Sequence, residues 1–166
     1  MLFKTSLLSL VLISNFALAK KNLHSHEHGH VELSIAYDKN IAEIELETPA
    51  DSFFGFEYAP KNDKEKTIVE NAKKSWTNLL SEIVIFPKES NCLVSEIEFK
   101  HVLQEKESHS EVEASAKVTC EKEIAGTKID ILFIGKFPQA KKLKLEAVGS
   151  KSQSLMLKKT KETITL

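Results

Sequence analysis

The sequence contains no arginine: all 23 of its basic residues are lysines, set against 24 acidic residues. Arginine is the side chain that binds phosphates and carboxylates through two parallel hydrogen bonds, so its absence argues against phosphoryl chemistry. The net charge of −1 gives no indication that the protein binds nucleic acid. The nucleophile elbow is also missing. The letters H-E-x-x-H do occur, at residues 26–30, but in a stretch that reads as extended chain and not as the helix that would bring both histidines to one catalytic ion.

The sequence also lacks an apolar run long enough for a membrane-spanning helix, which needs about 20 residues. The main apolar stretch near the N-terminus, residues 7–13, follows the positively charged Lys4, and an A-x-A cleavage pattern ends at Ala19. We therefore expect residues 1–19 to be a secretory signal peptide that is cleaved near Ala19. Residues 20–166 should then form a single exported domain that is not inserted in the membrane.

Cysteine is scarce as well, since the chain has two, Cys92 and Cys120. A lone pair of cysteines in an oxidising compartment usually forms a disulfide, and we expect this one. The alternative is that the two thiolates bind zinc. Their separation does not match the C-x₂-C spacing of a zinc knuckle, and an oxidising compartment opposes free thiolates.

Histidine, in contrast, is concentrated in one short stretch. Four of the six histidines, His24, His26, His28 and His30, alternate with other residues, and Glu27 lies among them. Neutral imidazole is the commonest metal ligand in proteins, and histidine together with carboxylate suits zinc. Alternate side chains of an extended chain project from one side about 6.6–6.8 Å apart, so neighbouring histidines can reach one ion. The alternative is a solvated polar tail that happens to be rich in histidine.

This row predicts a metal site on an N-terminal arm, residues 24–30, with zinc as the expected ion. Copper(II) or nickel is an alternative in the test tube, because copper(II) binds nitrogen ligands more tightly than zinc does. The processed chain keeps one methionine, Met156, which argues against a copper(I) site. If three histidines bind one zinc ion, protons compete at each of them. The affinity at pH 5.5 should then be about a thousandfold lower than well above the histidine pKa.

The residues after the histidines alternate in the pattern of a half-buried strand over 31–37, and residues 43–47 repeat that pattern. Residues 38–40 have the composition of a turn, so the two strands should form a hairpin. Apolar positions of the first strand are odd-numbered and the histidines are even-numbered. If the strand extends backward, the histidine side chains point away from the core. Residues 53–60 are dense in aromatics and should form a loop that packs over the core.

One principal helix is predicted over about residues 63–83. Asn62 can cap its first turn, with Glu65 three residues later as in a capping box, and its apolar residues recur at helical spacing. The rest of the chain alternates in short strands, of which residues 129–134 should be buried on both faces. We therefore predict the α+β class, with a mainly antiparallel sheet and the principal helix packed on one of its faces.

Two further histidines lie near the cysteines. Strand patterns over residues 93–103 and 112–118 flank a charged connection, with His101 and His109 on its two sides. A hairpin there would bring the two histidines close together and make them candidate metal ligands. The apolar positions are odd in one strand and even in the other, which conflicts with cysteines that lie directly opposite each other. A β-bulge, or strands that are not neighbours, would resolve the conflict.

Several segments occur in a fixed order over nearly the whole processed chain. They are His26-Glu27-His28-Gly29 followed by Val31-x-Leu33-x-Ile35-Ala36-x-Asp38, then Thr48-Pro49-Ala50-Asp51, Gly55-Phe56-Glu57-Tyr58-Ala59-Pro60, the two cysteines and Phe137-Pro138. In order, spacing and residue type the chain resembles the zinc-regulated protein A (ZrgA-like) family of Gram-negative periplasmic proteins. Tyr58 stands where the family often has histidine. The His-rich insertion that many members carry between the cysteines is reduced here to His101 and His109.

The resemblance implies a periplasmic zinc-binding protein that takes part in zinc homeostasis and assists a high-affinity ABC-type zinc importer. A partner would be the importer's periplasmic binding protein. Two other functions stay open from composition: an exported structural or interaction protein with incidental metal binding, and a zinc hydrolase. A catalytic zinc needs a rigid site with an open position and a general base, which histidines on a terminal arm do not provide, so we do not expect an enzyme. The candidate metal ligands are His24, His26, Glu27, His28, His30, His101 and His109.

Overall fold

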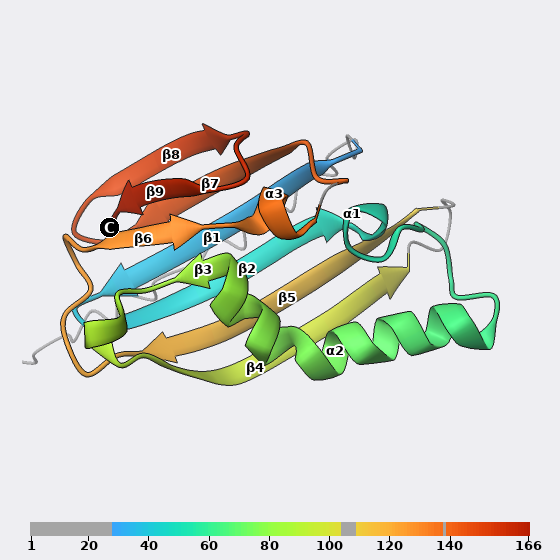
Figure 1. Cartoon of the computed structure of the whole chain (residues 1–166), viewed down its shortest axis with the longest axis horizontal. Helices are drawn as coiled ribbons and strands as arrows, with labels where there is room; N and C mark the ends of the chain where they lie inside the picture. Colours follow the sequence, from blue (N-terminus) through green and yellow to red (C-terminus); the bar gives the residue numbers. More distant parts are fainter. Residues whose placement is uncertain (1–27, 104–108, 138) are drawn as a thin grey trace, which may run out of the picture.

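Figure 1 shows the computed structural model of the chain, which describes residues 28–103, 109–137 and 139–166. Strands predominate among these residues. The strands are β1 (His30–Asp38), β2 (Ile41–Pro49), β3 (Val84–Ile85), β4 (Leu93–Leu103), β5 (Ser110–Thr119), β6 (Lys128–Ile131), β7 (Lys142–Val148), β8 (Ser152–Leu157) and β9 (Glu162–Thr165). The helices are α1 (Ala50–Phe54), α2 (Asp63–Ile83) and α3 (Phe133–Lys136), with a 3₁₀ turn, η1, at Lys88–Ser90.

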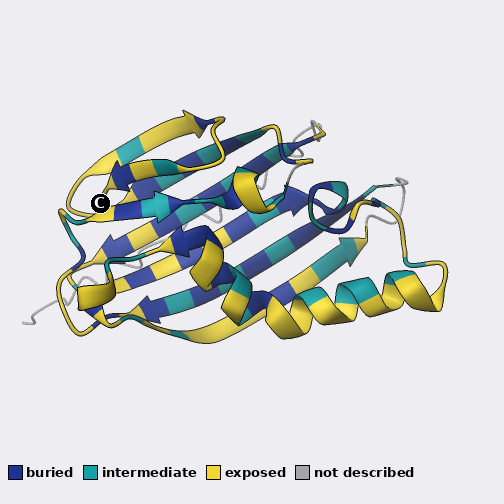
Figure 2. Ribbon diagram, in the orientation of Figure 1, coloured by how far each residue is buried: buried dark blue, intermediate teal, exposed yellow. Residues whose placement is uncertain are grey.

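The strands form two sheets, one of six strands in the order β4-β5-β2-β1-β7-β8 and one of three in the order β3-β6-β9. Neighbouring strands are antiparallel except β1 and β7, which run parallel. The three helices and the small sheet lie on one face of the large sheet (Figure 1). The buried side chains of all these elements form one apolar cluster, and Figure 2 shows the alternation of buried and more exposed positions along the strands.

The hairpin of β1 and β2 follows from the alternation in its sequence. Leu33 lies opposite Leu46 and Ile35 opposite Ile44, and all four side chains are buried. Burying one such side chain stabilises the fold by roughly 1.5–3 kcal/mol, so the register that buries all of them at once is strongly favoured. The turn lies at the predicted place, and Lys39 adopts a left-handed conformation with φ of 48°.

The principal helix is α2, and its first and last residues are those predicted. The side chain of Asn62 accepts a hydrogen bond from the backbone N–H of Glu65, which satisfies one of the donors at the start of the helix. Trp76, Leu80 and Ile83 are the buried residues of α2. They recur at helical spacing, and they pack this end of the helix on the large sheet.

The structure corrects the predicted α+β class. Strands account for 47% of the described residues and helices for 25%, so the chain is mostly β, with two sheets and one main helix. Residues 129–134 are not one strand buried on both faces: β6 ends at Ile131, and Phe133 begins α3. A short apolar run cannot be told from a buried helical turn by its periodicity. The small sheet was missed because β3 consists of only the two residues that follow α2, and its pairing with β6 is not encoded in a local pattern.

The conflict around the cysteines is resolved by a β-bulge. Strands β4 and β5 are antiparallel neighbours, and their register shifts between Ser95 and Glu98. Val94 before the shift and Phe99 after it therefore both face the core, whereas Leu93 is 75% exposed, against the expectation from its odd number. The predicted disulfide between Cys92 and Cys120 is present. Cys120 directly follows β5, whereas His109 directly precedes it, so the disulfide and His109 lie at different ends of this strand.

Candidate metal centre

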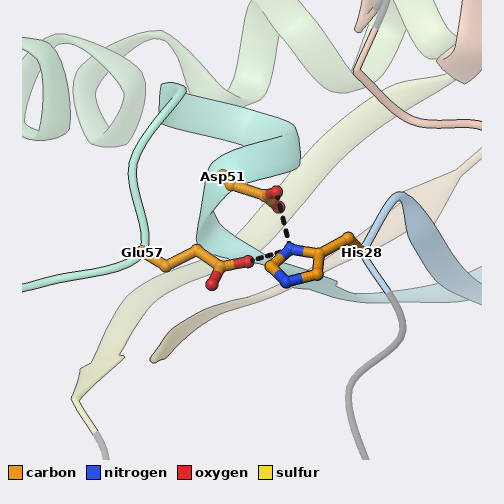
Figure 3. Close-up of side chains that lie close together, drawn as sticks. All are labelled: His28, Asp51 and Glu57. Carbon is orange, nitrogen blue, oxygen red and sulfur yellow. Dashed lines mark hydrogen bonds and ion pairs between the residues drawn. The ribbon is translucent and has the colours of Figure 1, made fainter. Parts of the chain in front are cut away.

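Three side chains that could hold a metal ion meet at one end of the large sheet. His28 precedes β1, Asp51 belongs to α1 directly after β2, and Glu57 follows α1. Each offers a ligand atom, and these atoms all lie within 4.8 Å of one another. Figure 3 shows both carboxylates pointing toward the imidazole of His28. The meeting follows from the hairpin, because antiparallel pairing places the start of β1 beside the end of β2.

The position of His28 depends on the glycine that follows it. Gly29 has φ of 77°, in the left-handed region that residues with a Cβ adopt at a cost. Its carbonyl oxygen accepts hydrogen bonds from the backbone N–H groups of Lys141 (2.8 Å) and Lys142 (3.1 Å). A Cβ on Gly29 would lie 2.9 Å from the carbonyl oxygen of Gln139. Both the backbone conformation and the close approach of the segment before β7 therefore require glycine here.

Asp51 is held by the short helix α1. The residues on either side of it, Ala50 and Ser52, are buried, so the carboxylate is left on the outer side of the turn. The hydroxyl of Ser52 donates to Asp51 Oδ1 at 3.2 Å, while Oδ2 faces His28. One carboxylate oxygen is thus fixed by the helix and the other is directed at the imidazole.

Glu57 lies in the aromatic segment that was expected to pack over the core. Phe54 and Phe56 are indeed buried, and their rings stack with centroids 5.6 Å apart. Gly55 between them ends α1 in a left-handed conformation with φ of 85°, which turns the chain back over the sheet. The Glu57 side chain is only 13% exposed and lies between two histidines.

The imidazole of His28 interacts with both carboxylates through the same atom. Its Nδ1 lies 3.2 Å from Asp51 Oδ2 and 2.9 Å from Glu57 Oε1. The hydrogen bond with Asp51 and the negative charge of Glu57 raise the pKa of His28 above its ordinary value of 6.5. A proton on His28 brings one positive charge to two carboxylates. A divalent cation between the three side chains would neutralise both.

His109 contacts the same site from the other side of Glu57. Its Nδ1 lies 2.5 Å from Glu57 Oε2, so the two oxygens of this carboxylate face two different imidazoles. The ring centroids of His28 and His109 are 6.0 Å apart. His109 is not one of the three residues whose ligand atoms lie within 4.8 Å of one another.

A model of one protein family, described as ZrgA family zinc uptake protein, matches residues 25–166. The chain belongs to the ZrgA family. The resemblance seen in the sequence is therefore confirmed, and zinc, which the family description names, is an ion that the donor atoms of His28, Asp51 and Glu57 can bind. The family is one of zinc uptake proteins, not of enzymes. No curated protein matches the chain.

The other predicted ligands are distributed differently. His24, His26 and Glu27 lie outside the described residues, as does the predicted signal peptide. His30 is the first residue of β1; its Nε2 is buried without a hydrogen-bond partner and lies 3.6 Å from Glu32 Oε1, too far for a hydrogen bond. Within the described ranges no helix is both long enough and apolar enough to cross a membrane.

His101 is not brought to the three-residue site. Its Nε2 lies 2.7 Å from the Ser110 hydroxyl, its ring meets Phe54 edge-on at 5.1 Å, and burial lowers its pKa. Tyr58, which stands where the family often has histidine, directs its hydroxyl to Glu65 on α2.

Asp51 and Glu57 are the site residues that reasoning from the sequence missed. Neither belongs to the row of histidines, and no spacing in the chain connects them with His28. A signal was nevertheless present, because both lie in segments that carry the family resemblance, Thr48–Asp51 and Gly55–Pro60. The aromatics of residues 53–60 predict packing over the core, which describes Phe54 and Phe56 but not Glu57, the carboxylate between Phe56 and Tyr58.

Proposed function

We propose that the protein binds zinc at His28, Asp51 and Glu57 and passes it on for uptake. The observation that carries the proposal is the convergence of one imidazole and two carboxylates from three separate segments. Tetrahedral zinc with N and O ligands at 2.0–2.2 Å keeps its ligand atoms about 3.3 Å apart. The 3.2 Å and 2.9 Å separations from His28 Nδ1 are close to that value, so only small side-chain movements are needed.

The three ligands leave the fourth position of a tetrahedral zinc ion free, and the site is open to solvent. The side chain of His28 is 63% exposed and that of Asp51 is 29% exposed. An open coordination position lets an incoming ligand bind the ion before the old ligands leave it. This suits a protein that receives and releases zinc better than one that stores it.

The neighbouring histidines have supporting roles in this proposal. His109 holds the second oxygen of Glu57 and fixes the direction of the first, as outer partners of metal ligands commonly do. The first part of the arm, with His24, His26 and Glu27, captures zinc from solution and delivers it to His28, while His30 is the first residue of β1. We further propose that the protein works in the periplasm, after removal of residues 1–19, and supplies the binding protein of an ABC-type zinc importer.

The test is a zinc titration of the metal-free protein at pH 8 by calorimetry and by competition with a chromogenic chelator. Asp51→Asn and Glu57→Gln should each weaken binding by at least tenfold, since each removes a charged ligand. Asp130→Asn is the matched control, because Asp130 is 27% exposed and also ion-paired, with Lys161, and lies in the small three-stranded sheet. Equal affinity of all four proteins would refute the site, and a wild-type protein that binds no zinc would refute the function.

A further inference from the structure

The loop that carries Glu57 has no regular structure of its own. It runs from Gly55, after α1, to Asn62, before α2. Glu57 can meet His28 and His109 at once only if this loop keeps one conformation. Its neighbours in the chain show how that is achieved. Phe56 is buried beside Phe54, while Tyr58 reaches in the other direction, toward the first turn of α2.

Glu65 joins the loop to α2 through both oxygens of its carboxylate. Oε2 accepts a hydrogen bond from the backbone N–H of Lys61 at 2.7 Å, and Oε1 accepts one from the Tyr58 hydroxyl at 3.3 Å. The backbone N–H of Glu65 itself donates to the Asn62 side chain at 3.0 Å. Three loop residues are therefore bonded to this one position of the helix.

The Tyr58 ring makes two further contacts within the loop. Its centroid lies 5.4 Å from that of Phe56, and the Lys61 ammonium lies 3.8 Å above the ring. A residue on each side of Glu57 is thus held, Phe56 by the core and Tyr58 by α2. The carboxylate between them has little freedom left to turn away from the two histidines.

We propose that Glu65, through Tyr58 and Lys61, is a positioning residue of the metal centre. It holds the loop in the conformation in which Glu57 reaches His28, so the ordering of the loop is complete before the ion arrives. This inference rests on the proposed zinc function. Glu65 touches none of the three proposed ligands and acts only through the loop.

An ordinary helix cap would explain part of these contacts. In a capping box the side chain of Glu65 would return to the backbone N–H of Asn62, the cap residue. Here it accepts instead from Lys61, one residue further into the loop. The cap of α2 is made by Asn62, so Glu65 is left to bind loop residues.

The experiment measures zinc affinity at pH 8 for Glu65→Ala, Glu65→Gln, Tyr58→Phe and the control Asp63→Asn. Asp63 is also an acidic residue in the first turn of α2, but it pairs with Lys66 and not with the loop. We expect Glu65→Ala to lose about tenfold in affinity, as is usual for partners that orient metal ligands. Tyr58→Phe, which loses one hydrogen bond, should lose about threefold. Glu65→Gln keeps an oxygen for Lys61 and should stay within about threefold of wild type, and Asp63→Asn within about twofold.

Several results would overturn this assignment. Unchanged affinity in Glu65→Ala would do so, as would equal losses in Glu65→Ala and Asp63→Asn, which would point to a general effect of the helix start. Equal losses in Glu65→Ala and Glu65→Gln would mean that the charge matters and not the contact. If Glu65→Ala does not fold, Tyr58→Phe decides, and wild-type affinity there refutes the proposal. Loss of binding in Asp51→Asn, combined with no loss in the Glu65 variants, would refute this inference and leave the zinc function standing.

Discussion

Zinc binding should depend on pH through His28, and the direction follows from the two carboxylates beside it. Zinc needs the neutral ring, so a proton on His28 competes with the ion. Because Asp51 and Glu57 raise the pKa of His28 above 6.5, this competition begins at a higher pH than for an isolated histidine. Affinity should be full well above that pKa and should fall about tenfold for each pH unit below it, since one proton is displaced.

The size of the loss separates this site from a cluster of histidines. At pH 5.5 the protein is at least one unit below the pKa of His28, so zinc affinity should be more than about tenfold weaker than at pH 8. Three histidine ligands would give roughly a thousandfold loss over the same range and displace three protons. Calorimetry at the two pH values in buffers of different ionisation enthalpy counts the protons released.

The metal-free protein shows the opposite dependence. A raised pKa in the folded state means that His28 stabilises the fold fully below about pH 6.5 and loses this contribution as the pH rises through its folded pKa. The ring titration, followed by NMR, should have its midpoint above 6.5. Asp51→Asn removes the carboxylate that contributes most to the raised pKa of His28, so this variant should lower the midpoint, whereas Asp130→Asn should leave it unchanged. A wild-type midpoint at or below 6.5, or no change in Asp51→Asn, would refute the electrostatic reasoning.

Two further predictions concern the scaffold. Gly29→Ala should destabilise the metal-free protein by more than the roughly 1–2 kcal/mol of a left-handed alanine, because its Cβ would also lie 2.9 Å from Gln139 O, and it should weaken zinc binding. Gly126→Ala is the control in urea unfolding: Gly126 has the same φ of 77° with nothing within 4 Å, so similar losses in both variants would show that the close approach at Gly29 is unimportant. Replacing both Cys92 and Cys120 by serine should cost about 3–4 kcal/mol of unfolding free energy, since their bridge spans 28 positions, and should leave zinc affinity unchanged. A lower zinc affinity in the double serine variant would contradict the expectation that the disulfide is separate from the metal site.

Local patterns were sufficient where neighbours in the chain decide the structure. The alternation in residues 31–37 specifies which face of β1 is buried, and the turn after it sets the register with β2. The start of α2 was predictable because Asn62 caps it by accepting a hydrogen bond from the backbone N–H of Glu65, only three positions later. These features depend on periodicity and on short-range hydrogen bonds, which the sequence displays directly.

Contacts between distant segments were not predictable in the same way. The bulge between Ser95 and Glu98 exchanges the inward and outward positions of β4, so the exposure of Leu93 could not be read from its number. The small sheet forms because β6 pairs with β3 and β9, each from a different part of the chain. Such pairings are selected by the burial of the whole core and not by any one segment, which is why the class was wrong.

For the metal centre too, some features were predictable from the sequence and others were not. The sequence by itself determined the ZrgA family, the disulfide and the presence of histidine with carboxylate as zinc donors, because these depend on residue type and order. Only the tertiary structure decided that His28 meets two carboxylates from other segments of the chain. The physical reason is the antiparallel pairing of β1 with β2. This pairing returns the chain to the end of the sheet at which β1 begins. There α1 presents Asp51, and the following loop presents Glu57, beside His28, which precedes β1.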